Sequence, residues 1–168
     1  MIITKRSDLV TFNIIGDTKG WELGRQYHRE DGPAVIEANG TKKWYLNGKR
    51  HRKDGPAIIW PNGSQEWCFH GKRHRKDGPA SIHADGYKAW WVKGRQDRKD
   101  GPAVIWPNGR QEWWINDHLH REDGPAVIHA DGTQEWWINS HSYSNLNAWA
   151  KAIDIDQETL LLLKLQYG

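Results

Sequence analysis

The stretch HREDGPAVIHADGTQEWWIN, residues 120 to 139, contains a turn signal, a short apolar run, a second turn signal and a pair of tryptophans. The same phrase, with small changes, also begins at His28, His51, His74 and Asp97. The step between copies, for example from residue 28 to residue 51, is 23 residues. A fixed step of this length is typical of a repeat architecture and decides the fold before composition does.

Each repeat predicts one β-hairpin. The chain runs from Asp-Gly-Pro-Ala through two β-branched residues to a tripeptide such as Pro61-Asn62-Gly63, and then leaves through Trp-Trp-Ile or its equivalent. A three-residue loop, with proline first and glycine in the left-handed bulge position, fits this tripeptide better than a two-residue Asn-Gly loop. We therefore predict a mainly β fold, a single-layer antiparallel meander of about six hairpins and about twelve strands.

The three-residue loop also decides which side chains share a face, because strand side chains alternate. One face carries apolar positions that recur in every repeat and is predicted to be structural: Ala34, Ile36, Trp44, Leu46; Ala57, Ile59, Trp67, Phe69; Ala80, Ile82, Trp90, Val92; Ala103, Ile105, Trp113, Ile115; Ala126, Ile128, Trp136, Ile138. The other face, here called the variable face, differs between repeats: Val35, Glu37, Thr41, Lys43, Tyr45; Ile58, Trp60, Ser64, Glu66, Cys68; Ser81, His83, Tyr87, Ala89, Trp91; Val104, Trp106, Arg110, Glu112, Trp114; Val127, His129, Thr133, Glu135, Trp137. Aromatic and charged side chains mixed on one face suit recognition, and cross-strand packing that stiffens the sheet is the alternative.

The chain divides into three predicted parts. Residues 1–27 form a degenerate repeat, residues 28–142 form the five clear repeats, and residues 143–168 form a C-terminal cap. Asn147 to Ile153 looks helical, and Asp154 with Gln157 could cap a second helix that runs into Leu160 to Leu165. Alternating apolar residues from Leu161 to Tyr167 also fit a strand. Such a segment covers the open end of a repeat sheet or forms a homodimer.

Catalytic and metal-binding patterns are weak in this sequence. The His-Arg-x-Asp-Gly-Pro phrase occurs five times, so we interpret its aspartates as ligands of turn amides and its arginines as partners across neighbouring repeats. His118, His120 and His141 have no finger-like spacing, so no metal is expected. Cys68 and His70 occupy positions that other repeats fill with core and turn residues. We predict a non-enzyme without cofactors.

Composition places few limits on partners. The 168 residues have a net charge of +3 and a mean hydropathy of −0.89. Cys68 is the single cysteine, which fits a reducing compartment, and the first residues lack the apolar run of a signal peptide or membrane span. We expect a cytoplasmic protein, in the host cytoplasm if the chain is viral.

Charge is concentrated on three consecutive connectors between hairpins. Residues 47–54 carry four basic residues against one acidic residue, net +3, and residues 71–77 have the same balance. Residues 93–100 carry four against two, net +2, whereas residues 25–31 are neutral and residues 117–123 are net −2. At about 4.8 Å per strand, this basic strip spans roughly 20 Å of one sheet edge. Lysine and arginine that guard an edge against pairing are the alternative interpretation.

The stretch from Asn47 to Trp67, NGKRHRKDGPAIIWPNGSQEW, resembles a MORN-type repeat, a unit of about 23 residues whose copies form successive hairpins. It is still more similar to divergent MORN-like repeats with an NGK-HREDGPA phrase in bacteriophage and giant-virus proteins. Trp-Trp-Ile-Asn replaces the Tyr-x-Gly opening of better-known MORN units, so their lipid binding is not carried over. The resemblance implies a host protein as partner and a role as an inhibitor of a defence or toxin protein.

We therefore expect a non-catalytic repeat protein that binds an acidic macromolecular partner. Nucleic-acid or nucleotide binding, through the basic edge and tryptophan stacking, is the alternative. The predicted binding residues are Trp60, Trp91, Trp106, Trp114, Trp137, Arg110, Lys49, Arg50, Lys72, Arg73 and Lys99.

Overall fold

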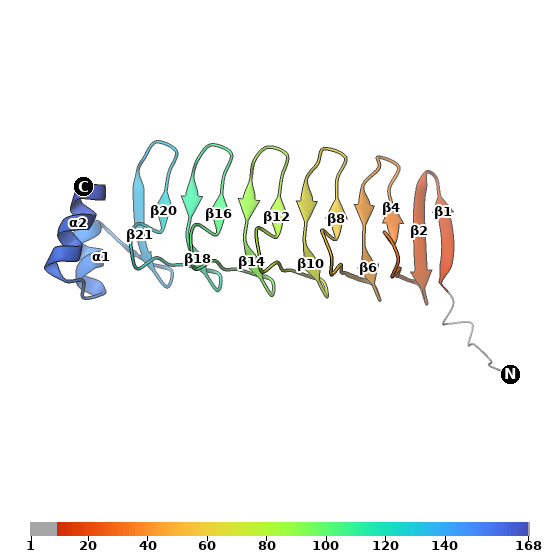
Figure 1. Cartoon of the computed structure of the whole chain (residues 1–168), viewed down its shortest axis with the longest axis horizontal. Helices are drawn as coiled ribbons and strands as arrows, with labels where there is room; N and C mark the ends of the chain where they lie inside the picture. Colours follow the sequence, from red (N-terminus) through yellow and green to blue (C-terminus); the bar gives the residue numbers. More distant parts are fainter. Residues whose placement is uncertain (1–9, 168) are drawn as a thin grey trace. The chain divides into compact units, whose positions relative to one another are not determined.

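The computed structural model describes residues 10–167, and it is mainly β with two C-terminal helices (Figure 1). Its hairpins form a long antiparallel meander, as predicted. The chain divides into two compact units, which we describe separately. The N-terminal unit contains Met1–Gly86 and Trp91–Gly94, and the C-terminal unit contains Tyr87–Trp90 and Arg95–Gly168.

The main sheet of each unit follows the chain from hairpin to hairpin. In the N-terminal unit the strand order is β1 (Thr11–Ile15), β2 (Thr18–Leu23), β4 (Val35–Ile36), β5 (Lys42–Lys43), β8 (Ile58–Ile59), β9 (Gln65–Glu66) and β12 (Ser81–Ile82), with β3 (Gln26–Tyr27) paired to β2. In the C-terminal unit the order is β13 (Lys88–Ala89), β16 (Val104–Ile105), β17 (Gln111–Glu112), β20 (Val127–Ile128), β21 (Gln134–Ile138) and β22 (His141–Tyr143).

The three-residue loop is confirmed by the register of the hairpins. Ile58 pairs with Glu66 and Ile59 with Gln65, which leaves Pro61-Asn62-Gly63 as the loop. The backbone N–H of Gly63 donates to the Trp60 carbonyl at 3.0 Å, and Gly63 has a φ of +85°. The left-handed conformation explains the glycine, because a side chain there is strained.

A second hairpin in each repeat was not predicted. The connectors themselves form short strand pairs: β6 (Tyr45–Leu46) with β7 (Lys49–Arg50), β10 (Cys68–Phe69) with β11 (Lys72–Arg73), and β18 (Trp114–Ile115) with β19 (His118–Leu119). Two further short strands, β14 (Trp91–Val92) and β15 (Arg95–Gln96), follow the same positions. Asn47 and Gly48 join β6 to β7 with φ values of 49° and 73°, the two left-handed residues of a type I′ turn. The prediction of about twelve strands was therefore too low.

Buried side chains lie on both the structural and the variable face. On the variable face, Val35, Ile58, Ser81, Val104 and Val127 are buried, together with Glu66 and Glu112. On the structural face the recurring alanines are buried, but Trp67 and Trp113 are only half-buried. Because the sheet has no second layer, side chains on both faces cover their neighbours.

An arginine lies over one structural-face tryptophan in five of the hairpins. The distances from guanidinium carbon to ring centre are 4.0 to 4.2 Å for Arg29–Trp21, Arg52–Trp44, Arg75–Trp67, Arg98–Trp90 and Arg121–Trp113. The charge partner is local: Arg121 Nε donates to Asp123 at 2.7 Å. The arginines were predicted to be partners across neighbouring repeats; they do contact the preceding repeat, but through a tryptophan ring, while their acidic partner lies in their own loop. The contact that joins adjacent repeats is the arginine on the tryptophan, and we call it the Trp–Arg stack.

The first histidine of the repeat phrase connects successive repeats. Nδ1 of His28 accepts the backbone N–H of Asn47 at 3.1 Å, and Nδ1 of His51 accepts that of His70 at 3.2 Å. Both donors are left-handed turn residues of the next small hairpin. The histidine therefore accepts a hydrogen bond from a turn amide that would otherwise need water as its partner.

The C-terminal segment is helical and covers the last strands. Helix α1 (Leu146–Ala152) begins after the N-cap Asn145, and helix α2 (Gln157–Tyr167) is capped by Asp156, whose Oδ1 accepts the N–H of Thr159 at 2.9 Å. The predicted cap Asp154 was wrong. The rings of Trp136 and Trp149 are 4.9 Å apart inside a small core. Among the described residues, no helix is long and apolar enough to cross a membrane.

Candidate functional site

Buried carboxylates organise the variable face of the C-terminal unit. Oε1 of Glu112 accepts the indole N–H of Trp106 and Oε2 accepts that of Trp114, each at 2.9 Å. Arg110 Nη2 lies 3.1 Å from the same carboxylate. Three of the predicted binding residues are therefore held by one glutamate. Trp106 is 39% exposed and its ring lies 5.0 Å from the Tyr87 ring, centre to centre, whereas Trp114 is half-buried.

Trp137 has a similar partner in Glu135. Its indole N–H donates to Oε2 of Glu135 at 2.9 Å, and His129 Nε2 lies 2.6 Å from Oε1. Burial alone would raise the pKa of Glu135, but the hydrogen bonds from His129 and Trp137 lower it overall. The carboxylate is therefore ionised, and this part of the face is acidic.

Two arginines of the predicted basic strip are bound to a buried glutamate in the N-terminal unit. Arg73 pairs with Glu66, and Arg50 Nη1 lies 3.4 Å from the other oxygen of Glu66. A cavity of about 310 Å³ is lined by these three side chains with Lys72 and Trp91. The structure thus brings together predicted residues from the connectors and from the variable face. It also gives Arg50 and Arg73 a structural role, because they neutralise a buried charge.

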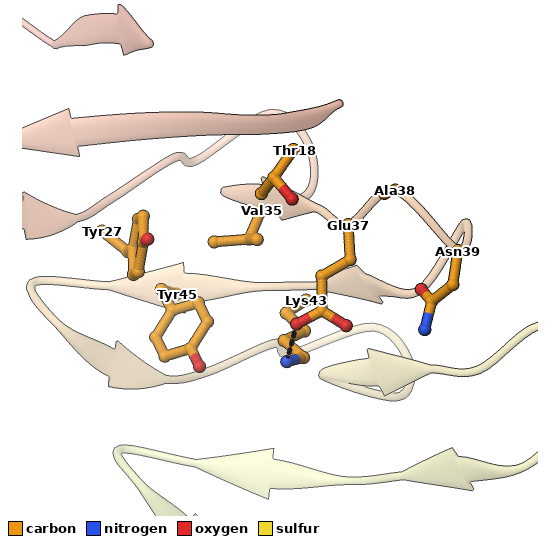
Figure 2. A pocket seen from close by; sticks show the side chains of 8 residues that line it. All are labelled: Thr18, Tyr27, Val35, Glu37, Ala38, Asn39, Lys43 and Tyr45. Carbon is orange, nitrogen blue, oxygen red and sulfur yellow. Dashed lines mark hydrogen bonds and ion pairs between the residues drawn. The ribbon is translucent and has the colours of Figure 1, made fainter. Parts of the chain in front are cut away.

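The first repeat has a different pocket on the variable face (Figure 2). Tyr27 and Tyr45 lie side by side with ring centres 5.5 Å apart, and Glu37 pairs with Lys43 beside Val35. The pocket has a volume of about 360 Å³. Its aromatic wall and internally paired charges differ from the surroundings of Glu66, so the variable face is not one uniform surface.

The exposed lysines of the basic strip lie on two short strands, β7 and β11, and on a loop. Lys49 and Lys72 lie on adjacent small hairpins, which are joined by the N–H of Gly71 donating to the Arg50 carbonyl at 2.8 Å. Lys99 lies in a loop of the C-terminal unit, and Trp60 is half-buried on the N-terminal unit. The predicted strip therefore belongs to two units, and only its first two connectors share one.

Charge is distributed unevenly between the units. The N-terminal unit has 16 lysines and arginines against 10 aspartates and glutamates, net +6. The C-terminal unit has 8 against 11, net −3, and the two values add to the chain's +3. The near-neutral total therefore conceals a basic unit and an acidic unit, each with its own long-range field.

Cys68 and the histidines offer little for catalysis. Burial, and then the neighbouring Glu66 carboxylate, raises the pKa of the Cys68 thiol to about 11, so the thiol stays protonated near neutral pH. The ring of His70 packs against His51 and Phe69 with centres 4.3 and 4.4 Å apart. Within residues 10–167, no group of three histidine, cysteine or acidic side chains could hold a metal ion.

Phe69 is an exposed aromatic residue that sequence reasoning missed. Phe69 was assigned to the structural face, but 40% of it is exposed. A signal was present, because Phe69 is the only aromatic residue in its column of repeats, where Leu46, Val92, Ile115 and Ile138 stand. The exposed neighbours Lys53 and Lys76 belong to the predicted basic strip, but they were not predicted to be binding residues.

The chain matches no protein-family model, and no curated protein matches it. The likeness to MORN-type repeats therefore stays a prediction from the repeat phrase.

Proposed function

We propose that this chain is a non-catalytic binding protein whose N-terminal unit engages an acidic macromolecular partner, as a protein inhibitor of the kind the repeat phrase suggests. The observation that carries the proposal is the charge difference between the units, net +6 against net −3. A field of this kind accelerates the encounter with a partner of opposite charge and sets which unit meets it. The buried carboxylates and the Trp–Arg stacks keep the surface rigid before binding, which lowers the entropy cost of association.

Nucleic-acid binding is less well supported by the same geometry. Trp106, Trp114 and Trp137 lie in the acidic unit, and their indole N–H groups are held by glutamates. Stacking platforms for single strands combine aromatic rings with a continuous basic groove. These three tryptophans lie beside carboxylates, which repel phosphates.

A long polyglutamate chain represents the acidic partner in a direct test of the proposal. We expect its association rate, followed by surface plasmon resonance, to fall about tenfold or more at low salt when Lys49 and Lys72 are both changed to Glu. Arg50 and Arg73 are left intact, because reversing them would leave Glu66 unpaired. Reversal of Asp117 and Glu122 to Lys in the acidic unit is the matched control and should not slow association.

Stronger binding to a deoxythymidine oligonucleotide than to polyglutamate would contradict an acidic protein partner and favour nucleic-acid binding. Equal association rates of the wild type and the Lys49→Glu, Lys72→Glu variant would show that Lys49 and Lys72 do not take part in binding.

The exposed leucines of helix α2 support a second proposal, self-association through the C-terminal segment. Leu161, Leu162 and Leu165 are 59%, 60% and 78% exposed on one helix. Exposed apolar residues grouped in this way favour a protein contact. Changing Leu161 and Leu165 to Glu should convert a dimer to a monomer in sedimentation-velocity experiments. A monomeric wild type at high concentration would end this proposal.

A further inference from the structure

Two similar cavities lie on the structural face, each between two consecutive loops of the His-Arg-x-Asp-Gly-Pro phrase. The first cavity, in the N-terminal unit, has a volume of about 710 Å³ and lies between residues 52–55 and 74–77, with Trp67 and Phe69 among its lining. The second, in the C-terminal unit, has about 670 Å³ and lies between residues 98–101 and 120–123, with Trp113 and Ile115 in the same positions. We call them the first and the second loop groove.

The first loop groove has an exposed aromatic residue in its floor. The Phe69 ring is 40% exposed and lies 4.6 Å from the His51 ring and 6.2 Å from the His74 ring, centre to centre. Trp67 beside it is already covered on one side by Arg75 at 4.1 Å. Phe69 is therefore the part of the floor that a ligand can still cover, and an aromatic ring of this kind is a good anchor for an apolar side chain.

The walls of the two grooves differ in charge. The first groove has Arg52, Lys53, Arg75 and Lys76 against Asp54 and Asp77, net +2. The second has Arg98, Lys99 and Arg121 against Asp100, Glu122 and Asp123, net zero. The main substitution is glutamate at position 122 where the first groove has Lys76.

The arginines of the first groove are occupied in the fold, whereas its lysines are exposed. Arg52 and Arg75 each donate to the carbonyl of the proline four residues later, and each lies over a tryptophan ring. Lys53 and Lys76 extend from the two opposite loops at exposed positions. The groove thus combines an apolar floor with one exposed positive charge on each wall.

We propose that the first loop groove is the docking site for a short acidic segment of a protein partner, which places an apolar side chain on Phe69 and flanking carboxylates beside Lys53 and Lys76. This inference rests on the proposed function and locates its contact. The groove volume suits a few residues of an extended peptide. The complementary charge supplies orientation, and the covered ring supplies most of the binding energy.

The charge pattern favours a peptide over a nucleic-acid strand. Asp54 and Asp77 lie within the groove, and they repel a continuous phosphate backbone, whereas a peptide can place its carboxylates at separate points. A single strand that tracks along repeats also needs basic residues on each of them, and the second groove has no excess of positive charge.

The test uses fluorescein-labelled Glu-Glu-Phe-Glu-Glu with blocked termini and the full chain, in a fluorescence anisotropy titration. We expect saturable binding that weakens about tenfold or more when Lys53 and Lys76 are both changed to Glu, and by a similar factor for Phe69→Ala. Replacing the central Phe of the peptide by Ser, or its Glu residues by Gln, should weaken binding comparably. Lys99→Glu and Ile115→Ala in the second groove are the matched controls, and each should stay within about twofold.

Three results of this titration would overturn the proposal. It fails if the wild type does not bind the peptide, if the Gln peptide binds as well as the Glu peptide, or if the second-groove variants lose as much affinity. Tighter binding of a deoxythymidine oligonucleotide at the same residues would assign the groove to nucleic acid. If Phe69→Ala lowers the melting temperature, its loss of affinity is not interpreted, and the variant with both Lys53 and Lys76 changed to Glu alone tests the proposal. Polyglutamate binding that depends on Lys49 and Lys72 but not on Lys53, Lys76 or Phe69 would keep the proposed function and reject the groove.

Discussion

The guanidinium of Arg75 lies 4.1 Å from the centre of the Trp67 ring, and a Cβ atom on Gly78 would lie 3.1 Å from the same guanidinium carbon. The arginine is thus held between an indole ring and a residue that has no side chain. The same relationship recurs at Arg52 with Trp44 and Gly55. It explains why Arg and Gly have a constant spacing in the repeat phrase: glycine leaves room for the planar group to lie on the ring.

Arg75→Lys should lower the free energy of unfolding by about 1 to 2 kcal/mol, because an ammonium cannot lie flat on Trp67 while donating to the Pro79 carbonyl. Urea denaturation followed by tryptophan fluorescence measures the change. Lys76→Ala on the neighbouring exposed position serves as the control and should stay within about 0.5 kcal/mol. Equal losses for the two variants would contradict a special role for the stack.

Gly78→Ala should destabilise the protein by about 1 kcal/mol or more in the wild type, because the new methyl group displaces the guanidinium. The same substitution should cost clearly less when Arg75 is already alanine, since every close neighbour of the added Cβ belongs to Arg75. A double-mutant cycle measures this coupling. Additive effects would show that glycine is needed at this position for another reason.

Glu112→Ala should be among the most damaging single changes, at about 3 to 5 kcal/mol. It removes the buried acceptor of two indole N–H groups and the carboxylate that pairs with the half-buried Arg110. Thermal unfolding compared with Glu122→Ala, an exposed glutamate, isolates the effect of burial. A small loss at Glu112 would mean that water replaces the carboxylate.

Trp149→Ala should cost about 3 to 5 kcal/mol and expose the end of the sheet, because Trp149 is fully buried against Trp136. Light scattering should then report self-association through the uncovered strand. Lys151→Ala, at an exposed position of helix α1, is the control and should leave both stability and solubility unchanged. A soluble and stable Trp149 variant would argue against a capping role for the segment.

Stability should fall as the pH drops below the ordinary histidine range. Burial, and then the charges of His70 and Lys53, lowers the pKa of His51, so the folded state binds a proton less readily than the unfolded state. The stabilisation is complete above the unfolded pKa of about 6.5 and is lost as the pH falls from there to the lower folded pKa. Protonation of Nδ1 also removes the acceptor of the His70 N–H.

His51→Asn keeps an acceptor near Nδ1 without a titrating group, so its melting temperature should change less between pH 7.5 and pH 5. His118→Asn is the control, because His118 is exposed and bonds only at the surface to Ser140. Identical pH profiles for the wild type and His51→Asn would attribute the acid sensitivity to other groups.

The turn chemistry made much of the fold predictable from the sequence. A tripeptide such as Pro61-Asn62-Gly63 determines loop length locally, and loop length determines register, so the main hairpins follow from a few adjacent residues. The small hairpins were missed because their positive charges suggested a connector. The left-handed residues at Asn47 and Gly48 were the signal, and they recur at His70 and Gly71.

Burial and the groove were harder to predict because they depend on contacts between repeats. Alternation indicates which residues share a face, but it does not show how far neighbouring side chains cover them, and Ile58 on the variable face is buried. The first loop groove needs residues 52–55 and 74–77 on two sides of Phe69. That proximity follows from the stacking of whole repeats, and no local sequence pattern indicates it.

The histidine contacts between repeats have a consequence for how such a chain can evolve. Each joins residues a constant 19 positions apart, from His28 to Asn47, from His51 to His70 and from His120 to Asn139. An in-frame duplication or loss of one complete histidine-containing repeat therefore keeps this donor–acceptor spacing, whereas an insertion of any other length breaks it. The gene can change the length of this protein in whole steps, and each added copy brings a new groove whose charge is then open to selection.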